Sequence, residues 1–167
     1  MLPNYSHADA VLSEDGVHRY ALSREWSSGT GLCGFIGLNP STADACKDDP
    51  TIRRCVGFAR DWGYAGIRVV NLFSRRTKNP ALLKLADYPQ CIGGARNEQT
   101  IRECVDACRI VVAAWGIHGA YRNRAAEVLG ALNGAAIYQL GMTRQGYPRH
   151  PLYLPRGATA KPLVAQQ

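Results

Sequence analysis

The chain has 167 residues, of which 46% are hydrophobic and 20% are charged. This composition excludes a disordered chain, and the length fits one domain, predicted over residues 1–167, with a core that needs no disulfide or metal to hold it. The formal net charge of +7 favours a polyanionic partner over an acidic one.

No stretch of the sequence is typical of a membrane protein. The longest apolar runs, such as residues 110–115, are too short to cross a bilayer. The N-terminus has no basic segment followed by an apolar stretch. We therefore expect a cytoplasmic protein without membrane contact, and we find no sign of an obligate protein partner.

The first 40 residues predict a β-hairpin followed by a buried strand. Residues 10–13 and 17–24 are the two hairpin strands, with a turn at Glu14-Asp15-Gly16 between them. The apolar run 32–38 ends at Asn39-Pro40. A short run of this kind, bounded by turn residues, indicates a strand buried on both faces.

From residue 48 onward, predicted helices and strands alternate. Asp48-Asp49-Pro50 has the pattern of a capped helix start, and the helix ends near Gly63 with Ile52, Cys55, Val56 and Ala59 facing inward. Strand 67–73, a loop, helix 95–107, strand 109–115, helix 121–132 and strand 135–140 follow. A long C-terminal loop completes the chain.

This alternation predicts an α/β fold. Right-handed βαβ units imply a three-layer α/β/α sandwich with a mainly parallel four-stranded central sheet, plus the N-terminal β-hairpin. In such folds ligands bind beyond the carboxyl ends of the strands. The residues at the strand ends are therefore the candidates for a functional site.

Two amides stand at these strand ends. Asn39 follows the strand 32–38, where it either caps a turn or faces a ligand. Asn71 interrupts an otherwise apolar strand, and a buried amide without partners costs about 1–3 kcal/mol. An amide offers both a donor and an acceptor, which suits reading the edge of a nucleobase.

The C-terminal loop contains a histidine in a stiff segment. His150 lies within the segment 148–155, where three prolines fix φ and remove backbone donors. A histidine held in this way is a good candidate for a positioned hydrogen-bond donor. His118 is a weaker candidate, and no phosphate-binding glycine loop or serine nucleophile motif is present.

The six cysteines indicate packed, reduced thiols more than a metal or iron–sulfur site. No Cys-x-x-Cys motif and no secretory signal is present. Cys104 and Cys108 would lie one helical turn apart, so a soft-metal site stays an open alternative. We expect no cofactor and no metal.

Four motifs resemble those of the uracil-DNA glycosylase superfamily, in the same order along the chain. They are Gly37-Leu38-Asn39-Pro40-Ser41, Val69-Val70-Asn71-Leu72-Phe73, Val111-Val112-Ala113-Ala114-Trp115-Gly116 and His150-Pro151-Leu152. Residues from about 10 to 155 also resemble a bacterial and phage family described as domain of unknown function 1643 (DUF1643). The distant resemblance supplies a mechanism, whereas the closer one supplies no activity.

The glycosylase resemblance implies a role for each matching residue. Asn39 would hold the attacking water, Asn71 would read the base, and His150 would donate to the base oxygen as charge develops. The implied base-binding set is Gly37, Pro40, Ser41, Asn71, Phe73 and Trp115. The family's stacking aromatic is missing from residues 42–54, where Ile52 is the nearest apolar substitute and Phe73 is an alternative.

The predicted function is hydrolysis of the N-glycosidic bond of a flipped, modified base, in DNA repair or base modification. The expected partner is a nucleic acid, with DNA favoured, or a nucleotide, with phosphate contacts from Arg75, Arg76, Arg144 and Arg149. Two alternatives are a non-catalytic nucleic-acid-binding module and an enzyme of modified-nucleotide metabolism that uses the same pocket.

Overall fold

The N-terminal part of the computed structural model is a β-hairpin, as predicted. The structure describes residues 4–85 and 87–164, so the predicted domain of residues 1–167 includes some residues outside the described part. Strands β1 (His7–Leu12) and β2 (Arg19–Glu25) pair antiparallel, with His7 opposite Glu25. Gly16 takes a φ of 69° in the turn, a conformation that glycine adopts without steric cost.

Four central strands are parallel to one another. They are β3 (Leu32–Gly37), β4 (Gly66–Asn71), β5 (Ile110–Ala113) and β6 (Ile137–Gln139). The sheet order is β1-β2-β4-β3-β5-β6-β7, and the pairs β4–β3, β3–β5 and β5–β6 are parallel. The four predicted strands therefore form the middle of the sheet.

The sheet has more strands than the four that the sequence predicted for its centre. The hairpin extends the sheet because β2 pairs antiparallel with β4, with Leu22 opposite Val69. At the other edge, the short strand β7 (Lys161–Pro162) pairs antiparallel with β6 inside the predicted C-terminal loop. The described chain thus has a mixed α/β fold around a seven-stranded sheet.

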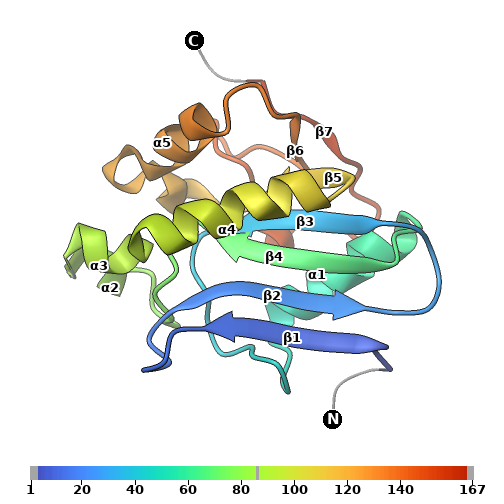
Figure 1. Cartoon of the computed structure of the whole chain (residues 1–167). Helices are drawn as coiled ribbons and strands as arrows, with labels where there is room; N and C mark the ends of the chain where they lie inside the picture. The colour runs from blue at the N-terminus through green and yellow to red at the C-terminus, as the bar shows by residue number, and fades with distance from the viewer. Residues whose placement is uncertain (1–3, 86, 165–167) are drawn as a thin grey trace.

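Helices cover both faces of this sheet. Helix α4 (Gly94–Ala107) lies in front of the sheet and α1 (Pro50–Asp61) lies behind it (Figure 1). Ile101 and Cys104 of α4 belong to the core on one face, together with residues of α5 (Arg124–Ala131). Ile52 and Cys55 of α1 belong to the core on the other face.

The start of α1 is built as the sequence predicts. The Asp49 side chain accepts a hydrogen bond from the backbone N–H of Ile52 at 2.9 Å, and Pro50 is the first helical residue. These features satisfy or remove the free amides of the first turn. The four residues predicted to face inward, Ile52, Cys55, Val56 and Ala59, are all buried.

Other segments differ from the sequence prediction. The loop before α4 contains two short helices, α2 (Leu82–Leu85) and α3 (Tyr88–Ile92). The helix predicted over 121–132 begins instead at Arg124, after the 3₁₀ segment η1 (Ile117–Asn123), because Arg122 and Asn123 have positive φ. A further 3₁₀ turn, η2 (Pro151–Tyr153), lies in the C-terminal loop.

In the described part of the chain, each helix lacks the length or the apolar character that crossing a membrane would require.

Candidate functional site

A cavity of about 480 Å³ opens at the carboxyl ends of β3, β4 and β5. We call it the strand-end cavity. Residues after these strands form one side, the N-terminal turn of α1 forms another, and the segment around η2 covers it. The residues that line the cavity include Arg19, Phe35, Gly37, Asn39, Ser41, Asp49, Ile52, Asn71, Trp115, His118, Arg149, His150 and Tyr153.

Asn39 lines the cavity with a fixed side chain. Its Nδ2 donates to the backbone carbonyl of Pro40 at 3.0 Å and to that of Thr77 at 2.8 Å. Both amide protons are therefore used, which leaves the oxygen Oδ1 as the hydrogen-bonding group for a ligand. Oδ1 is an acceptor, and a water molecule is one donor that it can hold.

Asn71 brings a buried donor without a partner into the same cavity. Its side chain is 3% exposed, and within the described residues its Nδ2 has no hydrogen-bond acceptor. A buried donor left unpaired costs about 1–3 kcal/mol. This arrangement is typical of a group that is satisfied by a ligand.

Gly37 makes room for the Asn71 side chain. A Cβ atom at position 37 would lie 2.7 Å from Oδ1 of Asn71, well inside van der Waals contact. The neighbouring parallel strands β3 and β4 place Gly37 directly opposite Asn71. Steric crowding by Asn71 therefore explains why the first motif has a glycine at position 37, which the sequence alone did not reveal.

His150 is the N-cap residue of η2, and a backbone hydrogen bond holds its side chain. Its Nδ1 accepts a hydrogen bond from the backbone N–H of Leu152 at 3.3 Å. With Nδ1 as acceptor, the neutral ring carries its proton on Nε2, which is then a donor. Burial lowers the pKa of His150, against an opposing effect of the Asp49 carboxylate, so the neutral form prevails at pH 7.

Trp115 lines the cavity, but its indole ring packs into the core on the face covered by α4. The residue is 2% exposed, and its Nε1 has no acceptor within the described residues. Its ring lies against Gly119, where a Cβ would come within 2.1 Å of the indole. The side-chain N–H groups offered to the cavity are therefore those of Asn71 and His150, which suit a ligand with more than one acceptor.

Some residues of the predicted base-binding set lie elsewhere. Ser41 lines the cavity, as Gly37, Asn71 and Trp115 do. Pro40 is buried beside the cavity without lining it. Phe73 is fully buried in the core beneath α4, where its ring meets that of Tyr121 at 6.1 Å, because it points to the opposite face of the sheet.

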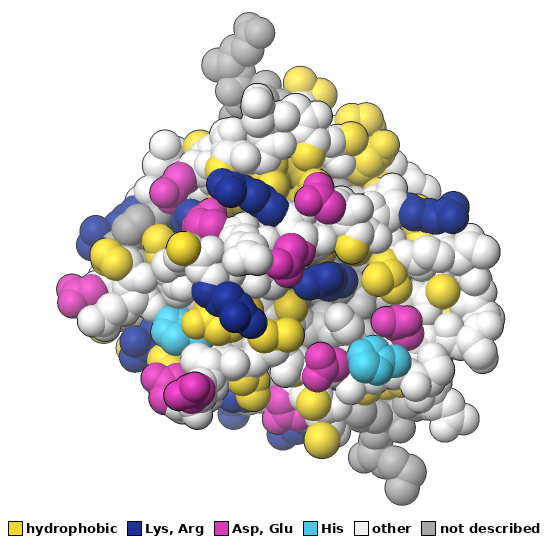
Figure 2. All heavy atoms as spheres, viewed as in Figure 1, with side chains coloured by type: hydrophobic (Ala, Val, Ile, Leu, Met, Phe, Trp, Pro, Cys, Tyr) yellow, Lys and Arg dark blue, Asp and Glu magenta, His cyan; other side chains and the backbone are white. Residues whose placement is uncertain are grey.

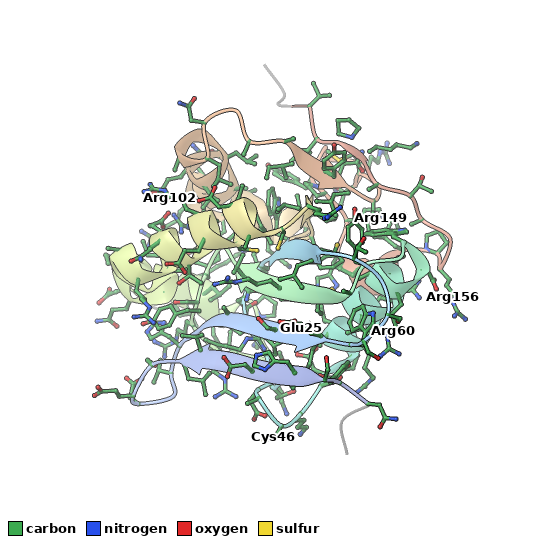
Figure 3. All side chains as sticks on the ribbon, turned by 45° about the vertical axis from the view of Figure 1, so that its right-hand side comes forward. Glu25, Cys46, Arg60, Arg102, Arg149 and Arg156 are labelled. Atoms are coloured by element: carbon green, nitrogen blue, oxygen red, sulfur yellow. The ribbon has the colours of Figure 1, made fainter. Side chains whose placement is uncertain are left out.

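Only one of the four predicted phosphate-binding arginines lines the cavity. Arg149 is exposed at its rim, and its position is labelled in Figure 3. Arg75 and Arg76 border a separate surface hollow next to the hairpin turn, and the exposed Arg144 does not line the strand-end cavity. The face covered by α4 has basic and acidic side chains interspersed (Figure 2).

The sequence prediction missed two charged residues of the cavity, Arg19 and Asp49. Asp49 was interpreted only as a helix cap, yet its carboxylate is buried at the cavity. Arg19 lies on a predicted strand, where the sequence gives no sign of its direction. The exposed His118, a weaker candidate in the sequence, also lines the cavity.

The cysteines lie away from this cavity, apart from Cys55 in its floor. In residues 4–85 and 87–164, no three His, Cys, Asp or Glu side chains are grouped as a metal site would need. The Sγ atoms of Cys104 and Cys108 are 4.0 Å apart. Their hydrogen bond lowers the pKa of Cys108, while that bond and burial raise the pKa of Cys104.

A comparison with protein families gives one match. Residues 19–152 match the model of a family described as a protein of unknown function, DUF1643. The chain belongs to the DUF1643 family. No curated protein and no solved structure matches the chain significantly.

The part of the chain that matches DUF1643 includes the whole strand-end cavity except Tyr153. It begins at Arg19 and ends two residues beyond His150. In this DUF1643 chain, the cavity is therefore a feature of the family domain rather than of the flanking segments.

Proposed function

We propose that this DUF1643 protein binds a nucleobase in the strand-end cavity and hydrolyses its N-glycosidic bond. The observation that carries the proposal is the buried Nδ2 of Asn71, which has no partner among the described residues, in a side chain that lines one cavity together with Asn39 and His150. These three residues match the motifs that resemble uracil-DNA glycosylases. The same resemblance supports a three-layer arrangement of the glycosylase type.

The base edge would meet donors. The Nδ2 of Asn71 is buried at the cavity and has no acceptor among the described residues. A base with carbonyl oxygens or unprotonated ring nitrogens satisfies such a group, whereas an exocyclic amine does not. We therefore propose an oxo-substituted base as the ligand.

The attacking water would be held by Asn39. The two carbonyls that bind its Nδ2 fix the amide and leave Oδ1 to accept a hydrogen bond from the water. An amide is a weak base, so its contribution is orientation of the water rather than removal of its proton. The base must then be able to leave as an anion, and this anion or bulk water takes up the proton that the attacking water loses when its oxygen bonds to the sugar carbon.

His150 would assist the departure of the base. Negative charge develops on the base oxygens as the glycosidic bond breaks, and a fixed donor at that place lowers the barrier. The hydrogen bond from Leu152 to Nδ1 leaves the Nε2 proton for this task. A neutral imidazole performs this role without giving up its proton.

Stacking on the base would come from residues other than those predicted. Phe73 is on the far face of the sheet, whereas Ile52 and Phe35 line the cavity. Tyr153 also lines it and is 71% exposed, so its ring lies at the opening. We assign the stacking contact to Phe35 inside the cavity and to Tyr153 at its rim.

In DNA the target nucleotide would have to flip out of the duplex to reach the cavity. Arg149 at the rim would bind the flanking backbone. Arg75, Arg76 and Arg144 would contact phosphates further along the strand, as the net charge of +7 favours. The biological role would then be repair or modification of DNA bases.

A second candidate is hydrolysis of a free modified nucleotide. The cavity volume of about 480 Å³ has room for the sugar as well as the base, and three of the four candidate DNA-binding arginines lie outside the cavity. Both observations favour a small ligand that enters whole.

The test is incubation of the protein with oligonucleotides and free nucleotides that carry a panel of altered bases, followed by mass spectrometry of released bases. We expect release from at least one substrate, and Asn39→Ala and His150→Ala to reduce it by about 100-fold or more. Arg102→Gln, on the outer side of α4, is the control. Binding without release from any substrate would instead support a non-catalytic binding module.

A further inference from the structure

The described part of the chain has three buried arginines, and one of them differs from the other two. Arg24 forms an ion pair with Asp48 at 2.9 Å, and Arg124 forms ion pairs with Glu98 and Glu127. Arg19 is equally buried, at 2% exposure, yet no described carboxylate lies within 4.0 Å of its guanidinium group. A buried guanidinium without a directly paired carboxylate is costly unless a ligand supplies an anion.

The Arg19 side chain lines the strand-end cavity with an unsatisfied donor. Its Nη1 donates to the backbone carbonyl of Ala43 at 2.9 Å, which holds the guanidinium in place. Its Nε is buried and has no acceptor within the described residues. The fixed guanidinium therefore keeps hydrogen-bonding capacity for a ligand.

An irregularity in β2 directs Arg19 to this cavity. The register between β1 and β2 shifts so that Val11 faces Ala21 but Leu12 faces Arg19. Tyr20 and Ala21 both lie on the face covered by α4, where Arg96 stacks on Tyr20. This bulge breaks the alternation of the strand and turns Arg19 to the face of α1.

The charge of Arg19 persists in the cavity. Burial lowers its pKa to about 10, while the Asp49 carboxylate opposes that shift, so the guanidinium is protonated at pH 7. A guanidinium binds phosphate oxygens through fixed, charge-assisted hydrogen bonds. The strands β2 and β4 are neighbours, so an anion at Arg19 would lie beside a base at Asn71.

We infer that Arg19 is the phosphate-binding residue of the strand-end cavity. The inference rests on the proposed nucleobase site and adds that the ligand enters as a nucleotide, with its phosphate on Arg19 and its base on Asn71. The phosphate belongs either to a free mononucleotide or to a flipped nucleotide within a strand. Both sources present the same phosphate chemistry to Arg19, and an oligonucleotide probe distinguishes them.

The experiment measures binding by isothermal titration calorimetry. The probes are deoxyuridine and deoxyinosine, each compared with its own 5′-monophosphate. We expect the wild-type protein to bind a monophosphate about 10-fold to 100-fold more tightly than the matching nucleoside, which is typical of charged hydrogen bonds. Equal affinities, or no binding of either monophosphate, would overturn the inference.

The variant Arg19→Gln should remove the preference for the monophosphate and leave the affinity for the nucleoside within about twofold. Arg19→Lys keeps the charge and should retain part of the preference. The matched control is Arg102→Gln, which removes one exposed charge from α4, well separated from Arg149 in Figure 3, and should change nothing. Equal weakening of both probes by Arg19→Gln would indicate a structural role and contradict the inference.

A short single-stranded oligonucleotide with the same nucleotide inside it distinguishes the sources. If Arg19→Gln weakens this probe as much as the monophosphate, the phosphate belongs to a strand. If it weakens the monophosphate alone, the ligand is a free nucleotide. Because all readouts are binding, a monophosphate preference without base release would refute the hydrolytic function and leave the phosphate subsite standing.

Discussion

The Nδ2 atom of Asn39 lies 2.8 Å from the carbonyl oxygen of Thr77, a residue 38 positions later in the chain. This contact joins the end of β3 to the segment after β4 and fixes which side of the amide faces the cavity. An aspartate at position 39 would place a carboxylate oxygen, in the position of Nδ2, against both the Thr77 and the Pro40 carbonyl.

For that reason Asn39→Asp should destabilise the protein instead of improving the site. We expect a loss of about 1–3 kcal/mol in the free energy of unfolding at pH 7, because two hydrogen bonds are lost and an acceptor is left unpaired. Urea denaturation measures it. Asn79→Asp is the control, since the Asn79 side chain acts as an acceptor for Ala81 and keeps that role; similar losses in both variants would refute the explanation.

Asn71→Leu should separate stability from binding. The substitution removes a buried donor that has no acceptor in the described structure, so the melting temperature of the free protein should stay unchanged or rise. Binding of a nucleobase should fall by about 10-fold or more, because its partner is gone. A large drop in melting temperature would show that Nδ2 already has a partner in the free protein.

Gly37→Ala tests the contact between the first two motifs. The added Cβ would lie 2.7 Å from the Asn71 Oδ1, so the amide must move out of its position. We expect base release to drop by about 10-fold or more with a smaller change in stability, since a small misplacement is costly to catalysis. Gly130→Ala, where a Cβ meets nothing within 4 Å, should leave base release unchanged; equal rates in the two variants would argue against the positioning role.

His150 predicts a dependence of stability on pH. Burial lowers the pKa of the folded-state imidazole below its ordinary value of 6.5. Its contribution is therefore present in full above pH 6.5 and is lost as the pH falls through the folded-state pKa, because protons then bind preferentially to the unfolded chain. Urea denaturation from pH 7.5 to pH 5 should show this loss in the wild-type protein and in His7→Gln but less of it in His150→Gln. Identical slopes for all three proteins would exclude the effect.

The fold could be predicted from the sequence where local signals are strong. The apolar runs that became β3, β4 and β5 and the Asp49-Pro50 start of α1 are such signals. Strand β7 could not be predicted, because its two exposed residues include a proline and carry no hydrophobic pattern. The start of α5 was placed too early, since Arg122 has a positive φ, which is uncommon for a residue of this type.

The site could be predicted in part for a similar reason. Asn71 stood out as a polar residue in an apolar strand, and parallel strands bring their ends together. Arg19 did not stand out, because a bulge changed the face on which it lies. Phe73 was assigned to the site from its motif, yet β4 ends at Asn71, so strand alternation does not extend to Phe73 and its ring packs on the opposite face from the cavity.

The most direct test of the nucleobase site is the side-chain amide signal of Asn71 in ¹⁵N–¹H NMR spectra during titration with uracil, hypoxanthine and xanthine. The account predicts a saturable shift of the Nδ2 protons for at least one base. Asn97 serves as the internal control, because its Nδ2 already donates to the backbone carbonyl of Asn71 at 3.0 Å. An Asn71 signal that shifts with none of the bases, or only in parallel with that of Asn97, would contradict the account.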